Sequence, residues 1–246
     1  MKVKKKKNKG SLLIGITAFV LLVSTLATVA YISVIKIKAA FPIKRINFIG
    51  NKHITVDELR ALAGIHSNES LITLSGKKIS QRLLKSPWIK SVRVRKEFPG
   101  TLSIVVGEVV PFALLDVNGH IFLTDDKGNL LEELKDNPIP FLPIITGDPF
   151  KEKEGFLEAL TLAKTMNDMG FSSERDQIEI VLSKPQEITS IIDGTVIKIG
   201  AGEYREKLER LLELEEDIQK RKIPVDYIDL RFANRVVVRP IKEVIN

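Results

Sequence analysis

Two pairs of acidic residues are the part of this sequence that could carry out chemistry. Asp125-Asp126 and Glu132-Glu133 lie close together in the chain. Two carboxyl groups on either side of a sugar bond are what glycoside hydrolysis requires. These two pairs, however, flank a predicted turn at 126–129, where acidic residues are common, and the surrounding sequence indicates no cleft. We therefore interpret them as turn residues rather than as a glycosidase site.

Metal and phosphate sites have no better support. His53, His66 and His120 stand far apart in the chain, and none belongs to a spaced ligand motif, so we interpret them as surface histidines. Gly200-Ala201-Gly202 precedes a predicted helix as a phosphate loop would, but Glu203 would repel an anion. The chain has no cysteine, which excludes disulfides and thiolate chemistry. We predict that the protein is not an enzyme and holds no metal or cofactor.

An uncharged stretch of 26 residues, Gly10 to Ile35, organises the chain instead. As a helix at about 1.5 Å per residue it would cover roughly 39 Å, enough to cross a hydrocarbon core of about 30 Å. Thr28-Val29-Ala30 could serve as a signal cleavage site, but the apolar region of a signal peptide is only about 7–15 residues long. We predict an uncleaved transmembrane helix over residues 10–36.

The charges on either side of this helix predict its orientation. Residues 1–9 form a basic tail with six lysines, and the positive-inside rule places such a tail in the cytoplasm. The bulk of the chain then lies beyond the cytoplasmic membrane. The net charge is +7, and the tail accounts for six of these charges. The high isoelectric point is therefore no indication of nucleic-acid binding.

The first predicted unit beyond the helix covers residues 41–109. An apolar run at 43–49 is followed by turn residues, which indicates a strand. Thr55 and Glu58 have the spacing of a capping box at the start of a helix, and Gly64 would end that helix.

A second helix and two strands complete this unit. Ser75 is a suitable N-cap, and Pro87 would end the helix because a proline disfavours the helical state of the residue before it. Strands are predicted around 92–95 and 102–106, with a turn at Pro99-Gly100. The predicted order of elements is β-α-α-β-β.

Residues 110–246 are rich in predicted strands. Asn118-Gly119 indicates a hairpin, because both residues tolerate positive φ. Residues 137–149 contain four prolines, and we interpret them as an extended surface connection. The remaining predicted elements are helices at 154–169 and 203–220 and strands at 112–115, 120–123, 178–182, 188–192, 195–199, 227–232 and 235–239. We interpret the charged side chains of the second helix as a solvated face.

Several short motifs, specific in their order and spacing, resemble the FtsQ/DivIB family of cell-division proteins. They include Phe48-Ile49-Gly50-Asn51, Pro87-Trp88-Ile89, Phe98-Pro99-Gly100-Thr101-Leu102 and Asp229-Leu230-Arg231-Phe232. The resemblance implies an α+β fold in which a transmembrane helix precedes a POTRA domain at 41–109. It also implies a mostly antiparallel β-domain with helices at 110–246.

The last strand is the region where a partner is expected. Its three consecutive valines leave open, by pattern alone, whether it is a core strand or an edge strand. In the FtsQ/DivIB family the terminal strands receive the FtsB/DivIC partner by β-addition. The resemblance therefore implies a partner-binding site at Phe232, Asn234, Val236, Val237, Val238 and Arg239.

The function implied by the resemblance is that of a non-enzymatic divisome scaffold. It would recruit the FtsB/DivIC–FtsL coiled coil, contact other divisome membrane proteins and help regulate septal peptidoglycan synthesis. Its location would be the cytoplasmic (inner) membrane at the division septum. The alternative is a POTRA-containing component of protein transport or outer-membrane assembly.

Overall fold

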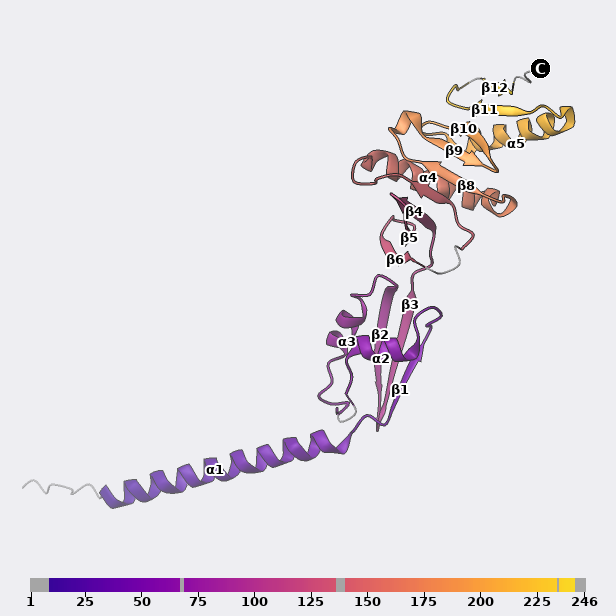
Figure 1. Ribbon diagram of the computed structural model, residues 1–246. Helices are drawn as coiled ribbons and strands as arrows, with labels where there is room; N and C mark the ends of the chain where they lie inside the picture. The colour runs from indigo at the N-terminus through magenta and orange to yellow at the C-terminus, as the bar shows by residue number, and fades with distance from the viewer. Residues whose placement is uncertain (1–8, 67–68, 136–139, 234, 242–246) are drawn as a thin grey trace, which may run out of the picture. The chain divides into compact units, whose positions relative to one another are not determined.

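A helix of 32 residues, α1 (Lys9–Ala40), begins the chain in the computed structural model (Figure 1). Its segment Gly15–Ser33 is long and apolar enough to cross a membrane, and none of it is buried in the protein. The hydroxyls of Thr28 and Ser33 donate to carbonyls one turn earlier, 2.8 Å away in each case. Such internal pairing is what a lipid environment demands of a polar side chain. The structure describes residues 9–66, 69–135, 140–233 and 235–241.

Two compact units make up the chain, Met1–Glu108 and Val109–Asn246. After α1, the first unit contains a three-stranded sheet in the order β1-β3-β2, with β1 parallel and β2 antiparallel to β3. The predicted order β-α-α-β-β is confirmed. Its elements are β1 (Arg45–Ile49), α2 (Val56–Ala63), α3 (Gly76–Leu83), β2 (Ile89–Glu97) and β3 (Thr101–Glu108).

Both helices of this unit begin as the sequence predicted. The Thr55 N–H donates to Glu58 Oε2 over 2.8 Å, and the Glu58 N–H donates to Thr55 Oγ1, which completes the capping box. Ser75 is the N-cap of α3. That helix ends at Leu83, however, and not at Pro87 as predicted. A turn follows it, in which the Lys85 and Ser86 N–H groups donate to the carbonyls three residues earlier.

The second unit is built on a nine-stranded sheet in the order β12-β11-β10-β9-β8-β7-β4-β5-β6. Most neighbouring strands are antiparallel, as predicted, but β7 runs parallel to both β4 and β8, and β10 runs parallel to β11. The strands are β4 (Ala113–Val117), β5 (His120–Thr124), β6 (Leu130–Leu134), β7 (Ile144–Thr146), β8 (Ile178–Val181), β9 (Thr189–Ile192), β10 (Thr195–Lys198), β11 (Val225–Asp229) and β12 (Val237–Pro240).

Two α-helices pack against the sheet of this unit. Helices α4 (Lys153–Asp168) and α5 (Tyr204–Arg221) bury Met166, Leu208 and Leu211 in one core with isoleucines of the central strands. Short 3-10 turns, η1 (Phe171–Glu174) and η2 (Pro185–Glu187), flank β8.

The segment 137–149 is where the predicted fold was wrong. Residues 140–149 were expected to form part of a surface connection, but they contain β7, a strand in the interior of the sheet with Ile145 fully buried. Pro143 and Pro149 lie outside the three paired residues, so neither removes a ladder hydrogen bond from β7. Residues 137–139 lie outside the described part of the chain.

Candidate partner-binding edge

Strand β12 forms one edge of the nine-stranded sheet and pairs only with β11 in the part of the chain that the structure describes. The sequence pattern left open whether the last strand is a core strand or an edge strand, and the structure shows an edge strand. The strand begins at Val237, whereas the predicted strand began at Arg235. Asn234 of the predicted site lies outside the described residues. Arg235 and Val236 lead into β12 without strand pairing.

The outer side of β12 can be assigned from its backbone. The Ile241 N–H donates to the Pro224 carbonyl over 2.9 Å and so faces β11. Because successive backbone groups of a strand face alternate sides, Val237 also turns its N–H and C=O towards β11. Val238 turns the same groups away from the sheet. Pro240 occupies an outward position too, where its missing N–H costs no ladder bond.

The consecutive valines lie in different environments. Val236 is partly buried against the core of the unit, whereas Val237 is 37% exposed. Arg239 is exposed and lies along β11, with its Nε 3.4 Å from Asp226 Oδ2 and its guanidinium 5.7 Å from the centre of the Tyr227 ring. The core therefore uses only part of the valine run, which leaves apolar surface at the edge.

Phe232 lies in the bend before β12 and not in a strand, since β11 ends at Asp229 rather than at Phe232 as predicted. Its side chain is 39% exposed, and the Arg235 guanidinium lies over the ring, 4.6 Å from its centre. Arg210 of α5 donates to the Phe232 and Ala233 carbonyls over 3.2 and 2.7 Å. An arginine on α5 thus holds the bend that carries Phe232.

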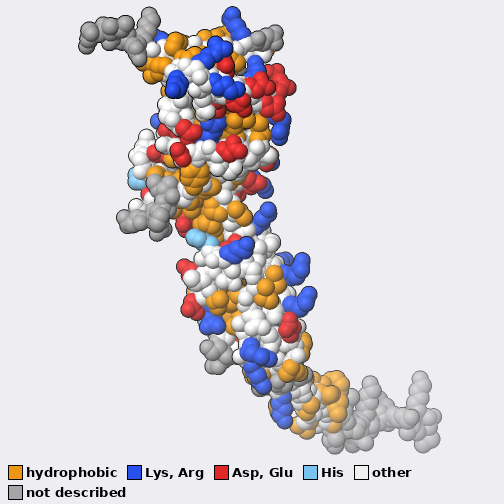
Figure 2. Space-filling model, turned by 90° about the vertical axis from the view of Figure 1, so that its right-hand side faces the viewer, with side chains coloured by type: hydrophobic (Ala, Val, Ile, Leu, Met, Phe, Trp, Pro, Cys, Tyr) orange, Lys and Arg blue, Asp and Glu red, His pale blue; other side chains and the backbone are white. Residues whose placement is uncertain are grey.

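A groove of about 460 Å³ separates α5 from the segment leading into β12. It has apolar, basic and acidic walls, and Figure 2 shows acidic and basic side chains intermixed over this end of the second unit. Its lining residues are Arg210, Glu213, Leu214, Asp217, Ala233, Arg235 and Val236.

Sequence reasoning missed this groove because it treated the charged face of α5 as solvated. That interpretation suits the end of the helix, where Arg221 pairs with Asp217 over 3.0 Å. It is incomplete at Arg210, which binds backbone carbonyls. Arg210, Leu214 and Asp217 recur at helical spacing, and this was the available signal.

The motif Asp229-Leu230-Arg231 stabilises the end of β11 next to this site. Arg231 donates from Nε and Nη2 to the two carboxylate oxygens of Asp229, over 3.0 and 2.7 Å. This pairing lowers the pKa of Asp229 even though burial opposes the shift. Leu230 is fully buried, and its N–H donates to the Lys198 carbonyl. The motif is therefore structural and positions the start of the Phe232 bend.

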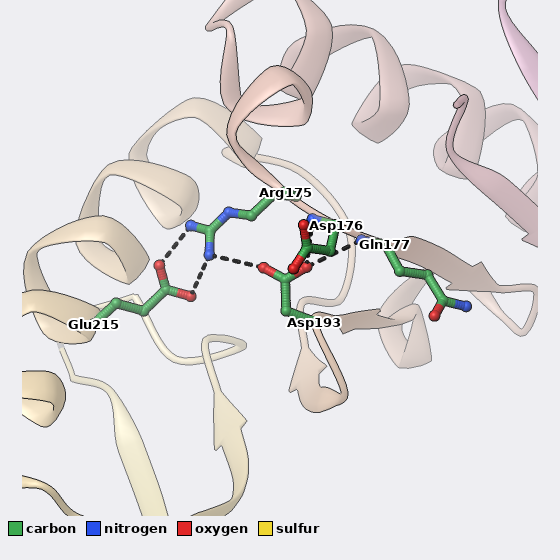
Figure 3. A network of polar contacts seen from close by, with 5 residues as sticks. All are labelled: Arg175, Asp176, Gln177, Asp193 and Glu215. Atoms are coloured by element: carbon green, nitrogen blue, oxygen red, sulfur yellow. Dashed lines mark hydrogen bonds and ion pairs between the residues drawn. The ribbon is translucent and has the colours of Figure 1, made fainter. Parts of the chain in front are cut away.

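A partly buried arginine, Arg175, also contacts α5. Arg175 donates to both carboxylate oxygens of Glu215, over 3.2 and 2.5 Å, and lies 3.4 Å from Asp193 (Figure 3). Asp193 in turn accepts from the N–H groups of Asp176 and Gln177 (Figure 3). Burial alone would lower the pKa of Arg175, but these two carboxylates raise it overall. The network ties α5 to the β9–β10 turn and so holds the wall of the groove in place.

Asp125 and Glu133, two of the residues first considered for catalysis, have structural roles. Asp125 accepts from the N–H groups of Lys127 and Asn129 and from the Asn129 side chain. Burial would raise the pKa of Asp125, but these bonds lower it, as suits a turn-forming carboxylate. His120 Nδ1 lies 2.8 Å from Glu133 Oε1. Within the described residues no group of three possible metal ligands comes together.

The turn at Gly200-Ala201-Gly202 binds a side chain of the protein itself. Lys207 is 4% exposed, and its Nζ donates to the Ala201 carbonyl over 2.8 Å. Burial lowers the pKa of Lys207. The turn therefore supports the start of α5, and its geometry offers no separate anion site.

Comparison with known proteins identifies the family. Residues 41–108 match the model of the FtsQ-type POTRA domain, and residues 107–231 match that of the C-terminal domain of cell division protein FtsQ/DivIB. This chain belongs to the FtsQ/DivIB family. The FtsQ/DivIB match ends at Arg231, so β12 lies beyond it.

Named FtsQ relatives have similar sequences over most of their length. Cell division protein FtsQ of Geobacter sp. (strain M21) is 34% identical over 200 residues, which cover 77% of this chain and 73% of the relative. FtsQ of Geotalea daltonii is 26% identical over 211 residues, covering 82% and 76%. FtsQ of Syntrophotalea carbinolica is 29% identical over 220 residues, covering 81% and 74%. The family and its role in cell division are thus established for this chain.

Proposed function

We propose that this FtsQ/DivIB-family protein is a non-enzymatic scaffold of the divisome that binds the FtsB/DivIC partner by β-addition at β12. Through that partner it recruits FtsL and regulates septal peptidoglycan synthesis. The observation that carries the proposal is the outward-facing backbone of Val238 on an edge strand. A strand that adds there gains main-chain hydrogen bonds without rearranging the sheet.

The surface beside the β12 edge could also bind a part of the partner that follows its added strand. Phe232 offers an aromatic anchor, and the groove beside α5 offers both signs of charge around apolar walls. Aromatic side chains and arginines are the residues that most often dominate interface energies. A partner strand followed by a charged amphipathic helix would use both features.

Two further observations support a scaffold over the alternatives. Of the acidic residues that could suggest catalysis, Asp125 is hydrogen-bonded within its turn, and Glu133 pairs with His120. The rival function, a POTRA-containing transport or outer-membrane assembly component, explains the first unit only. It does not account for the C-terminal unit, which matches the FtsQ/DivIB C-terminal domain.

The test of β-addition compares two neighbouring valines. Val238→Pro removes an outward donor and leaves a carbonyl of the partner strand unpaired, which costs about 1–3 kcal/mol and hence about 5- to 150-fold in affinity. Its thermal melting temperature should stay near that of the wild type. Val237→Pro removes a donor that faces β11 and should lower the melting temperature instead.

The measurement is titration calorimetry of the full-length protein in nanodiscs against the exported segment of FtsB/DivIC, alongside thermal melts. Wild-type affinity in Val238→Pro would refute β-addition at this edge. A lowered melting temperature in Val238→Pro but not in Val237→Pro would show that the assigned outward side of β12 is wrong.

Membrane topology is the second part of the proposal. We expect a single span with the N-terminus in the cytoplasm, because six lysines precede an apolar helix. An alkaline phosphatase fused after Asn246 should be active, and a reporter that works only in the cytoplasm should be inactive there. The opposite pattern would overturn the proposed localisation at the outer side of the cytoplasmic membrane.

A further inference from the structure

The residues that directly follow α1 are hydrogen-bonded to the rest of the first unit. The Phe41 carbonyl accepts from the Leu71 N–H over 2.9 Å and from Ser70 Oγ over 3.1 Å. Two residues later, the Ile43 N–H donates to the Glu69 carbonyl over 3.0 Å. No free linker therefore separates the end of α1 at Ala40 from the folded unit.

The length of α1 limits how far this end can lie from a membrane. The apolar run stops at Ile35, and Phe41 follows six residues later, with α1 continuing to Ala40. At about 1.5 Å per residue this distance is at most about 9 Å. The headgroup layer is roughly 5–8 Å thick on each side of the hydrocarbon core. Phe41 must therefore lie at or within the lipid headgroups, whatever the tilt of the unit.

Exposed apolar side chains lie at the same end. The ring of Phe98, in the turn between β2 and β3, packs edge-on against Phe41 with ring centres 5.2 Å apart. Phe98 is nevertheless 59% exposed, and Ile72, next to Leu71, is 40% exposed. Within the unit itself, these side chains are left without full cover.

Basic side chains accompany them. The N–H groups of Lys44 and Arg45 donate to the Gly100 carbonyl over 2.8 and 3.2 Å, which places both residues beside the Phe98 turn. A Cβ atom on Gly100 would lie 3.1 Å from Lys44 Cγ, so the Lys44 stem runs along this turn. Glu69 and Glu97 are the acidic residues nearby. A lysine with an apolar stem suits the boundary between acyl chains and phosphates.

We propose that the surface formed by Phe41, Lys44, Ile72 and Phe98, the anchor-proximal surface, sits in the lipid interface of the membrane that α1 spans. Phe98 and Ile72 insert at the level of the headgroups, and Lys44 lies beside lipid phosphate. This contact orients the unit on the bilayer, and it is independent of the partner edge at β12.

Site-directed spin labelling tests the proposal, and the chain is suited to it because it contains no cysteine. Phe98→Cys and Ile72→Cys each place one nitroxide at the anchor-proximal surface, the second with Phe98 intact. Leu84→Cys is the matched control, because Leu84 is 48% exposed but lies near the opposite end of the unit, before β2 begins. All three replaced side chains are exposed, so the fold should persist.

The full-length protein is reconstituted in vesicles of phosphatidylethanolamine and phosphatidylglycerol, and flotation first establishes that α1 anchors it. Labels at 98 and 72 should collide more with oxygen than with a water-soluble nickel complex, and the label at 84 should do the reverse. Equal nickel accessibility at 98 and 84 would overturn the proposal. Protection of the 98 label from both reagents would also overturn it, because a protein contact would then cover the surface.

Discussion

The two edges of the nine-stranded sheet are built differently. Edge strand β6 carries two adjacent acidic residues, and Glu133 pairs with His120 over 2.8 Å and lies 3.6 Å from Lys135. Its pairing with β5 is also shifted in register between Leu123 and Thr124. Edge strand β12 has no acidic residue. Its pairing with β11 is shifted in register only between Val225 and Tyr227, and it is regular from Val237 to Arg239.

This difference indicates which edge is open to another strand. Charged side chains and irregular register are the usual means by which proteins protect an edge from pairing. The protection at β6 leaves β12 as the edge suited to a partner. Pro240 then limits the added ladder, since it offers no outward donor beyond Val238. The β12 edge is thus open over a short length only.

The largest expected effect distinguishes two exposed phenylalanines, one near each edge of the sheet. Phe232→Ala should weaken binding of the FtsB/DivIC segment by about 2 kcal/mol, roughly thirtyfold, as expected for an aromatic anchor at an interface. Phe150, which is 89% exposed and lines a hollow beside Leu130 of β6, is the matched control. Phe150→Ala should bind as the wild type does in the same calorimetric titration. Equal losses in the two variants would remove the distinction between the edges.

Removing the protection of β6 should have a smaller effect. Replacing Glu132 and Glu133 by valine makes that edge apolar and uncharged, and it should then pair with other copies. Analytical ultracentrifugation should show self-association that increases with concentration, while the affinity for the partner stays within about twofold because β12 is untouched. Glu132→Gln with Glu133→Gln keeps the edge polar and serves as the control. A monodisperse valine variant would show that the carboxylates do not protect β6.

The smallest effect concerns pH. Arg231 lowers the pKa of Asp229 in the folded protein, so the pair stabilises the fold fully above about pH 4, the ordinary range of the aspartate pKa. That contribution is lost as pH falls through the lower folded-state value. The free energy of unfolding, measured by urea titration, should fall between pH 6 and pH 3 in the wild type. In Asp229→Asn it should fall less, and the two decreases should differ by roughly 1 kcal/mol or less.

Glu133→Gln on the β6 side is the comparison for that experiment. His120 and Lys135 lower the pKa of Glu133, but its carboxylate faces solvent, which weakens both interactions. We therefore expect a smaller change in slope than for Asp229→Asn. A larger change would mean that the ion pairs at β6 matter more to folding than the motif next to β12.

Short-range signals in the sequence predicted much of the fold. The capping box at Thr55 and the hairpin at Asn118-Gly119, with φ of 55° and 85°, formed as expected. Both depend on backbone angles and on groups within a few residues of each other, so local sequence contains the required information. The apolar helix α1 is readable for a similar reason, because its length and composition are properties of one continuous segment.

What only the tertiary structure decided is which segments become neighbours. β7 is three residues long, so its pattern was too short to recognise, and the burial of Ile145 comes from β4 and β8, which are distant in sequence. The same holds for the groove, where Arg210 meets Phe232 across 22 residues. The motifs and consecutive valines near the C-terminus directed attention to the last strand and to the bend before it. The edge position of β12 and the outward side of Val238 depend on strand pairing across the whole sheet, which no local pattern specifies.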